Sequence, residues 1–442
     1  MLKIYKPSMF NRIVRHNGDV VLYNSRTGTL GIRKVSAESE QHVGDLLSSA
    51  VVKVESETED TVIQRLIEGN YLVPIECNEK HIRTFIQNTF LCDSSLTIVV
   101  HLTQNCNFRC TYCYMDHKAV SIYPETQTGI VNFVRRNISQ YKSVTVSWFG
   151  GEPTLEMGVI ERLSKELIEI CRKANKPYNG VITTNGYLLT PKNIDILLRS
   201  RVTTICVTID GLKDVHDIQR VLANGSPTFE RIISNLLYIR DNIKRRIPEV
   251  ILRTNITKSH QKMLSDYCKF FDDLFGSDSR FSLFIRPVAD YGGTRVQALS
   301  PDFISDMSEV YEKIADIDSK IEFNLNYQDL NVGGSTCKSK GHSKFTIGCD
   351  GSVHKCDESL DYPLGHLYKS GKMDINLPTY AKWLSGYRSN ECDECFFSLC
   401  CFMEGCPKTR VFNNEVLPCH INFHEIDTLI WCYSKKHSCE EI

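Results

Sequence analysis

The fold is decided by two adjacent stretches, LTIVVHL at residues 96–102 and CNFRCTYC at residues 106–113. The first is a continuous apolar run typical of a buried β-strand. The second holds Cys106, Cys110 and Cys113 at the spacing C-x3-C-x2-C. Thiolates are soft ligands of iron–sulfur clusters, and three of them leave the fourth iron of a cubane free for another ligand. The loop therefore predicts a [4Fe-4S] cluster with an open position. A zinc knuckle or three buried thiols are the alternatives, although zinc normally takes four ligands.

Length, charge and hydropathy limit the number of domains and the kinds of partner that this protein can be expected to have. A chain of 442 residues is too long for one core, so two or three domains are expected. The net charge of −1 gives no sign of binding to nucleic acid or to a membrane surface. No apolar run approaches the ~20 residues of a membrane span, and the first residues lack the apolar centre of a signal peptide. We therefore expect a cytoplasmic protein with no nucleic-acid partner and no membrane partner.

Cysteine is unusually frequent in this sequence. The chain has 19 cysteines, and eight of them lie between Cys337 and Cys406. In a reducing compartment, metal binding is a more common use of clustered cysteines than disulfide formation. The clustering therefore predicts a second metal-binding region beyond residue 337.

Between residues 91 and 300, apolar runs alternate with helical patterns. Six runs are predicted to be strands, at residues 96–102, 144–148, 180–184, 204–209, 250–256 and 281–286. Repeating βα units imply a parallel sheet with right-handed crossovers, and six of them indicate an α/β fold with a partial (β/α)6 TIM-type barrel. Such barrels carry their chemistry at the carboxyl ends of the strands, so we expect functional residues there.

Three motifs follow the second, third and fourth strands. They are Gly150-Gly151-Glu152-Pro153, Thr184-Asn185-Gly186, and Thr208-Ile209-Asp210-Gly211 with Arg220 beyond it. Together with the cysteine loop they resemble the signature of the radical S-adenosylmethionine (radical SAM) enzymes. The resemblance implies that the open iron chelates SAM, and that the reduced cluster cleaves SAM to a 5′-deoxyadenosyl radical. It also implies a set of SAM-binding residues: Tyr112 near the adenine, Gly150, Gly151, Glu152 and Pro153 at the amino group, and Asn185, Thr208, Asp210 and Arg220 around the rest. Arg220 either reaches the SAM carboxylate or only holds its loop.

The cysteines beyond residue 337 resemble the SPASM domain, which follows radical SAM barrels in peptide and protein maturases. The resemblance implies two auxiliary [4Fe-4S] clusters. The first would take Cys337, Cys356 and Cys406, and either Cys349 completes it or one iron stays open. The second would take Cys392, Cys395, Cys401 and Cys419. The spacing between Cys401 and Cys406 is one residue longer than the family pattern, so Cys400 is an alternative ligand. A zinc ribbon is the competing interpretation of the cysteines that begin at Cys392.

Residues 1–90 are predicted to form a separate unit with a β-hairpin, two short helices and a strand at residues 71–74. This order resembles the RiPP recognition element, a winged-helix-like domain that binds the leader peptides of ribosomally made natural products. The resemblance implies that a leader strand pairs with an exposed sheet edge. A plain cap on the barrel is the alternative. The expected organisation is a recognition unit (1–90), a barrel (91–300), a linker (301–336) and a SPASM domain (337–442).

The combination predicts an oxidoreductase, a radical SAM maturase that installs a thioether or a C–C or C–O cross-link in a precursor peptide with a leader. An external one-electron reductant such as flavodoxin or ferredoxin is the expected redox partner. Asp357 directly follows Cys356 and resembles the catalytic aspartate of anaerobic sulfatase maturases, which makes it a candidate base. A hydrogen bond to a cluster loop is its alternative role. Two other functions stay open: a formylglycine-forming sulfatase maturase and a non-catalytic iron–sulfur adaptor that binds peptides.

Overall fold

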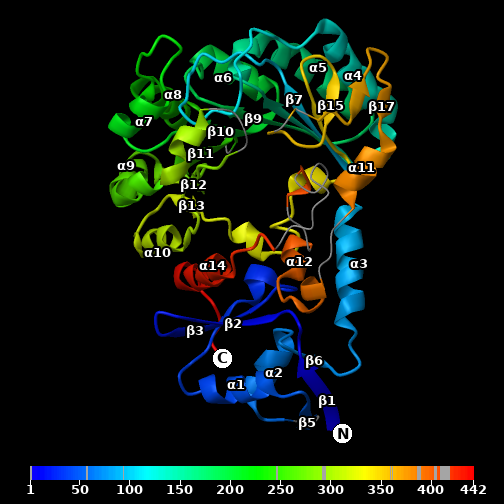
Figure 1. Cartoon of the computed structure of the whole chain (residues 1–442), viewed down its shortest axis with the longest axis vertical. Helices are drawn as coiled ribbons and strands as arrows, with labels where there is room; N and C mark the ends of the chain where they lie inside the picture. The colour runs from blue at the N-terminus through cyan, green and yellow to red at the C-terminus, as the bar shows by residue number, and fades with distance from the viewer. Residues whose placement is uncertain are drawn as a thin grey trace.

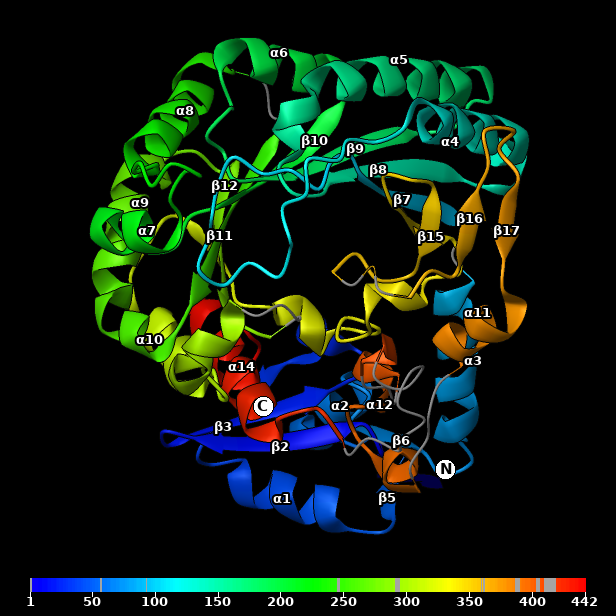
Figure 2. The same cartoon turned by 45° about the horizontal axis from the view of Figure 1, so that its top comes forward.

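A computed structural model describes residues 2–55, 58–92, 94–244, 247–290, 295–358, 360, 362–385, 390–402, 406–408 and 419–442. Within these residues the largest sheet has eleven strands, in the order β13-β12-β11-β10-β9-β8-β7-β14-β15-β16-β17. Its middle is a series of parallel strands that curve into an open barrel (Figure 2). They are β7 (Ser95–His101), β8 (Ser143–Phe149), β9 (Tyr178–Thr184), β10 (Val202–Thr208), β11 (Glu249–Ile256) and β12 (Phe281–Pro287). These strands confirm the predicted α/β fold with a partial (β/α)6 barrel.

Helices cover the outer face of the barrel (Figure 2). They are α4 (Pro124–Asn137), α5 (Met157–Lys173), α6 (Pro191–Arg199), α7 (Lys213–Gln219), α8 (Phe229–Asn242), α9 (Leu264–Phe275) and α10 (Ser308–Asp316). In α5 the side chains of Ile160, Leu163 and Leu167 are buried, because a spacing of three and four residues puts them on one face. Each helix thus closes one side of the barrel core.

Strands that the sequence did not predict extend both edges of the barrel. β13 (Glu322–Asn324) pairs in parallel with β12, inside the stretch that was expected to be a helical linker. On the other side, β14 (Lys344–Ile347) pairs in parallel with β7. The antiparallel strands β15 (Ser352–His354), β16 (Gly365–Leu367) and β17 (Met373–Ile375) follow it. Because Cys349 and Cys356 flank β15, this edge brings both cysteines next to the barrel.

The N-terminal residues form two small sheets. In one, β1 (Leu2–Pro7) lies between β5 (Val52–Glu55) and β6 (Leu72–Pro74); in the other, β3 (Asp19–Asn24) lies between β2 (Asn11–His16) and β4 (Arg33–Lys34). The predicted hairpin and both short helices, α1 (Glu40–Ser48) and α2 (Thr61–Glu68), are present, whereas β1 and β5 were not predicted. Asp60 caps α2, because its side chain accepts hydrogen bonds from the backbone of Val62 and Ile63.

The N-terminal sheets lie at one end of the molecule, beneath the barrel (Figure 1). α3 (Glu79–Leu91) connects them to β7, and α11 (Leu377–Leu384) follows β17. α12 (Ser398–Cys401) and α14 (Phe423–Lys436) lie between the N-terminal sheets and the barrel. An ion pair of 2.6 Å joins Arg12 of β2 to Asp427 of α14. Among the described residues, no helix has both the length and the apolar character needed to cross a membrane.

Candidate functional site

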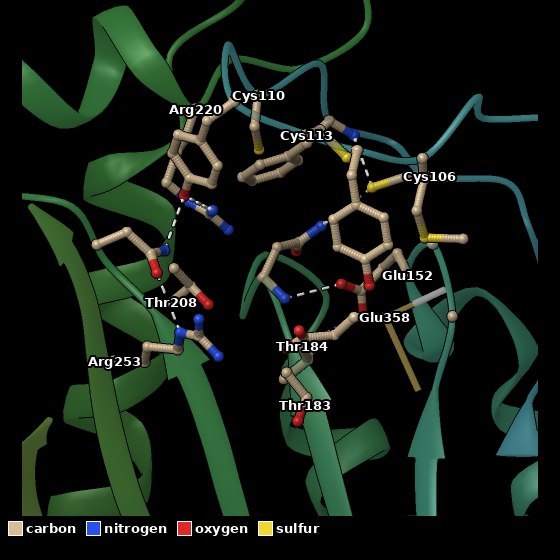
Figure 3. A pocket seen from close by; sticks show the side chains of 18 of the residues that line it. Cys106, Cys110, Cys113, Glu152, Thr183, Thr184, Thr208, Arg220, Arg253 and Glu358 are labelled. Atoms are coloured by element: carbon tan, nitrogen blue, oxygen red, sulfur yellow. Dashed lines mark hydrogen bonds between the residues drawn. The ribbon is translucent and has the colours of Figure 1, made fainter. Parts of the chain in front are cut away.

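A cavity at the carboxyl ends of the barrel strands brings most of the predicted motif residues together (Figure 3). Its lining includes Cys106, Cys110, Tyr112, Cys113, Gly150, Gly151, Glu152, Asn185, Thr208 and Arg220. Arg253 and Asn255 of β11 line it as well. Pro153 and Asp210 are buried and are not among the lining residues. Residues from four separate strand ends and one loop therefore meet at one place.

The cysteine loop is held by the segment that follows α7. The backbone N–H of Arg109 donates to the carbonyl of Val221 at 2.9 Å, and that of Thr111 donates to Gln219 at 3.0 Å. These bonds form a short antiparallel pairing that spreads the loop over the cavity mouth, with all three thiols in the lining. Within the described part of the chain, no three His, Cys, Asp or Glu side chains converge as closely as one metal ion requires.

The chemistry of the donor set suits a cluster. Burial, followed by the charge of Glu152, raises the pKa of Cys106 to about 12. Burial raises the pKa of Cys110 to about 11. Such thiols ionise only where a cation compensates their charge, and a metal centre supplies that compensation. Opposite them, the Nε atom of Arg220 is buried without a hydrogen-bond partner among the described residues. These residues fit a [4Fe-4S] cluster that three thiolates hold.

Two glycines let the second motif approach the cysteine loop. Gly150 has a φ of +127°, and a Cβ there would lie 2.4 Å from the carbonyl oxygen of Thr103. A Cβ on Gly151 would lie 2.1 Å from the carbonyl oxygen of Asn105. Because both residues are glycines, the two backbones can meet. The N–H of Gly151 donates to the carbonyl of Thr103 at 2.8 Å, and that of Glu152 donates to the carbonyl of Asn105 at 2.9 Å. The Gly-Gly pair is required because any other residue would push the motif away from the segment that leads to Cys106.

Glu152 joins the end of β8 to the end of β9. One carboxylate oxygen accepts hydrogen bonds from the hydroxyl of Thr184 at 2.6 Å and from the backbone of Thr154 at 3.0 Å; the other accepts from the backbone of Asn185 at 2.8 Å. Burial raises the pKa of this carboxyl group, and the hydrogen bonds oppose that rise. The side chain of Asn185 in turn donates to Asn107 of the cysteine loop at 2.8 Å. Glu152 is thus a structural anchor as well as a lining residue.

A buried network organises the wall that carries Tyr112. The Tyr112 hydroxyl donates to the carboxylate of Asp210 and accepts from Arg220 at 2.6 Å. Arg220 and Asp210 form an ion pair of 3.7 Å, and Asp210 also accepts from the backbone of Asn255 at 2.8 Å. Asp210 is fully buried, and the guanidinium of Arg220 lies 5.6 Å from the ring of Phe108. Of the two roles considered for Arg220, this geometry places it as a clamp on the cysteine loop, with one face open to the cavity.

The carboxylate that lines the cavity next to the auxiliary cysteine region is Glu358 (Figure 3). Burial raises its pKa, and Asp357 adds to the rise. Asp357 is not among the lining residues; its side chain is 38% exposed and pairs with Lys344 at 3.4 Å. The carbonyl of Asp357 accepts a hydrogen bond from His101 at 3.1 Å, which fits the structural role considered for this residue. Sequence analysis missed Glu358, because the sequence does not show which of two adjacent carboxylates faces the cavity.

The predicted auxiliary ligands are only partly brought together. Cys392 and Cys419 are close enough to Cys395 for their charges to raise its pKa, after burial as the main cause. Cys337, Cys406 and Cys419 are exposed. The motif residue Gly405 lies outside the described residues. Cys349 is buried, and its thiol donates to the carbonyl of His101 at 3.2 Å. The structure therefore places Cys392, Cys395 and Cys419 near one another, and Cys349 in a hydrogen bond to β7.

Cys400 lies at a contact between α12 and the N-terminal unit. The thiol of Cys400 is fully buried and lies 3.1 Å from the hydroxyl of Tyr23, which belongs to β3. Both groups also contact the carbonyl of Leu330. Burial raises the pKa of Cys400. Cys400 is consequently part of the contact between the N-terminal sheet and α12.

The helix α3 holds the loop that carries Cys392 and Cys395. Arg83 is 2% exposed, and its guanidinium donates to the carbonyls of Cys392 and Asp393 at 3.2 and 3.0 Å. It also pairs with the side chain of Asp393 at 3.0 Å. Sequence analysis gave no signal for this residue, because a single arginine on a helix is usually exposed.

A partial βα barrel with a three-cysteine loop at its mouth defines the radical SAM fold. The comparison with protein families agrees: residues 100–264 match the model of the Radical SAM superfamily. Residues 100–264 of this chain are therefore of the radical SAM type.

Two curated relatives are sulfatase-maturating enzymes. The cysteine-type anaerobic sulfatase-maturating enzyme of Clostridium novyi (strain NT) is 25% identical over 290 residues, which cover 60% of this chain and 74% of the relative. The serine-type enzyme of Bacteroides thetaiotaomicron is 23% identical over 350 residues, which cover 69% of this chain and 80% of the relative.

Two solved structures share the fold. The structure of anSMEcpe with bound AdoMet and the Cp18Cys peptide has a TM-score of 0.55 and 19% identity, and it covers 77% of this chain and 96% of its own. The structure of Streptococcus suis SuiB bound to its precursor peptide SuiA has a TM-score of 0.52 and 14% identity, and it covers 91% of this chain and 96% of its own. At these identities the likeness concerns the fold.

Proposed function

We propose that this protein is a peptide maturase that installs an oxidative cross-link in a ribosomally made precursor peptide. The observation that carries the proposal is the union of a three-thiol cavity at the barrel mouth with an N-terminal β unit that packs onto the auxiliary cysteine region. The likeness to SuiB, whose structure holds a precursor peptide, covers 91% of this chain. Because residues 91–442 make up less than 91% of this chain, the match must also include part of the N-terminal unit. This supports a role of that unit in peptide recognition.

The cavity residues have separate tasks in this proposal. Cys106, Cys110 and Cys113 would hold a [4Fe-4S] cluster which, with SAM on its open iron, supplies the 5′-deoxyadenosyl radical that takes a hydrogen atom from the peptide. Arg220 clamps the cysteine loop and keeps a positive charge at the cavity wall. The close approach at Gly150 leaves its backbone in the cavity lining, where it is positioned to bind the SAM amino group.

Closing a thioether or a C–C or C–O bond removes a second electron and a proton from the peptide. The electron requires an oxidant, and the proton requires a base near the reacting atom. Glu358 is the carboxylate in the cavity lining beside the auxiliary region, so we assign it the role of proton acceptor in preference to Asp357. Desolvation raises the pKa of Glu358, which makes its carboxylate a stronger base.

The remaining cysteines would hold two auxiliary clusters. We assign Cys392, Cys395, Cys401 and Cys419 to one of them, because the charges of Cys392 and Cys419 reach Cys395. Cys337, Cys356 and Cys406 are assigned to the other. Cys349 and Cys400 are left out of this assignment, because the resemblance to the SPASM pattern includes them only as alternatives. A flavodoxin or ferredoxin remains the expected reductant.

The decisive experiment supplies the reduced, anaerobically reconstituted protein with SAM and a leader-bearing precursor peptide. The expected products are 5′-deoxyadenosine and a peptide lighter by two hydrogen atoms. A variant with Cys106, Cys110 and Cys113 changed to alanine is the control and should form neither product. Absence of 5′-deoxyadenosine with the unaltered protein would instead favour the adaptor.

A second candidate is a formylglycine-forming maturase, and the two curated relatives favour it. The test is a peptide that carries the cysteine or serine of a sulfatase active site and has no leader. Formylglycine on this peptide, at a rate that a leader does not raise, would replace the cross-linking proposal.

A further inference from the structure

The outer edge of β4 in the N-terminal unit is already paired with another segment of the same chain. β4 lies at one edge of the sheet β2-β3-β4. Residues 440–442 run alongside it, with Lys34 and Glu441 as parallel partners. In Figure 1 this segment comes down from α14 onto the N-terminal sheets, where the chain end is marked C.

The pairing uses the hydrogen-bonding groups that an edge strand leaves free. The N–H of Val35 points inward and donates to Val20 of β3 at 2.9 Å. The N–H groups of Lys34 and Ser36 point outward; they donate to Glu440 at 3.0 Å and to Ile442 at 2.9 Å. The N–H of Ile442 donates back to Lys34 at 2.8 Å. Three main-chain bonds therefore close the edge, as they do when a peptide strand adds to a sheet.

Side chains make the pairing specific. Ile442 is 3% exposed and belongs to the apolar cluster of the N-terminal unit, which also contains Leu22, Val35, Val43, Leu66 and Tyr71. Arg33 forms an ion pair of 3.0 Å with Glu440, and Arg65 of α2 donates to the carbonyl of Glu441. The edge therefore selects an extended strand that has an acidic residue and, two positions later, an aliphatic side chain.

We propose that residues 440–442 are an intramolecular strand that occludes the β4 edge, and that an extended segment of the peptide substrate competes with them for it. The inference rests on the proposed function, which supplies the peptide. The paired segment has only three residues, and residues 437–439 join it to the end of α14. It can thus leave the edge without moving the helix. A tethered strand acts at an effective concentration on the order of millimolar, so a free peptide must outcompete it.

The test compares three forms of the full chain. Ile442→Asp puts a charge into the apolar cluster and should release the strand. Glu441→Gln is the matched control, because that side chain is exposed and only its main chain takes part in the pairing. The probe is a fluorescent synthetic peptide that corresponds to residues 436–442, with serine in place of Cys439. Its binding is followed by fluorescence anisotropy.

The probe is expected to bind Ile442→Asp at least about tenfold more tightly than it binds the unaltered chain or Glu441→Gln. If residues 440–442 occupy the edge in about nine of ten molecules, only about one molecule in ten can bind the probe, and the apparent affinity falls about tenfold. Hydrogen exchange should show faster exchange at Lys34 and Ser36 in Ile442→Asp, and the probe should restore their protection. A probe whose isoleucine is replaced by aspartate should not bind.

Equal binding of the probe to all three forms would overturn the proposal. So would full protection of Lys34 and Ser36 in Ile442→Asp. Because an aspartate can unfold the N-terminal unit, Ile442→Ala is measured in parallel. If both variants lower the unfolding temperature and neither gains affinity for the probe, the segment is a fixed part of the core. Cleavage of SAM is measured separately and should be equal in all forms, so a failure of the proposed function leaves the binding result intact.

Discussion

The buried ion pair between Asp210 and Arg220 gives the sharpest prediction about the barrel. At 3.7 Å, with the effective dielectric constant of about 20 that suits protein sites, two unit charges attract by about 4.5 kcal/mol. Asp210→Asn keeps the volume and removes the charge, so Arg220 is left buried and uncompensated. Measured losses for such broken pairs are about 3–5 kcal/mol. We therefore expect the barrel to lose about 4 kcal/mol of unfolding free energy, roughly a thousandfold in the unfolding equilibrium.

The assay is urea unfolding, with hydrogen exchange of residues 106–113 as the local readout, because Arg220 and Tyr112 hold this loop. Asp214→Asn on the exposed face of α7 is the matched control and should cost less than about 1 kcal/mol. Replacing both partners, Asp210→Asn with Arg220→Met, should recover part of the loss, since no unpaired charge remains. A loss no larger than that of the control, with unchanged exchange in the cysteine loop, would refute the reasoning.

Three further predictions concern separate parts of the molecule. Burial lowers the pKa of His216 to about 3 in the folded protein, whereas the ordinary pKa of histidine is about 6.5. As the pH falls below 6.5, the unfolded chain takes up a proton that the folded protein does not. The free energy of unfolding should therefore be about 2 kcal/mol lower at pH 5 than above pH 6.5. Urea unfolding at both pH values measures this slope, and His216→Gln should flatten it. Cys401→Ser should lower the iron content of the reconstituted protein by up to about four atoms per chain, whereas Cys400→Ser should not; the opposite ranking would reverse the ligand assignment. Glu358→Gln should slow peptide cross-linking by about 10²–10⁴ while 5′-deoxyadenosine still forms. Under the same assay Asp357→Asn should stay near the unaltered rate, and a reversed order would restore Asp357 as the base.

The barrel was predictable because its signals are local. Each strand is an apolar run of the right length, and each motif directly follows a strand, so their meeting at one edge follows from the parallel topology. The strands β13 and β14 were not predicted, because three or four residues carry too little periodicity to separate a strand from a loop. Their place is set by pairing with β12 and β7, which are distant in sequence.

The parts of the site that sequence could not show depend on contacts between distant segments. Cys400 and Cys401 are adjacent in the motif, and the sequence does not show that the thiol of Cys400 meets the hydroxyl of Tyr23. Glu358 and Asp357 are adjacent carboxylates, and the path of the chain after β15 decides which of them lines the cavity. In both cases two neighbouring residues have the same chemistry, and contacts with distant segments decide where each side chain lies.

The burial of Arg83 links these observations. A guanidinium removed from water is costly unless its donors are used. Here two carbonyls and a carboxylate of the Cys392–Cys395 loop accept from its two terminal nitrogens, whereas its Nε has no partner among the described residues. Since Arg83 lies on the helix that leaves the N-terminal unit, the auxiliary cysteine loop takes part of its shape from that unit. Arg12 of β2 adds a second contact, because its guanidinium lies 5.1 Å from the ring of Phe396, the residue after Cys395. Under the proposed function, a peptide strand bound on the N-terminal sheets would act on a body that packs directly against the loop of these thiols, so peptide recognition and redox chemistry would share one packed interface.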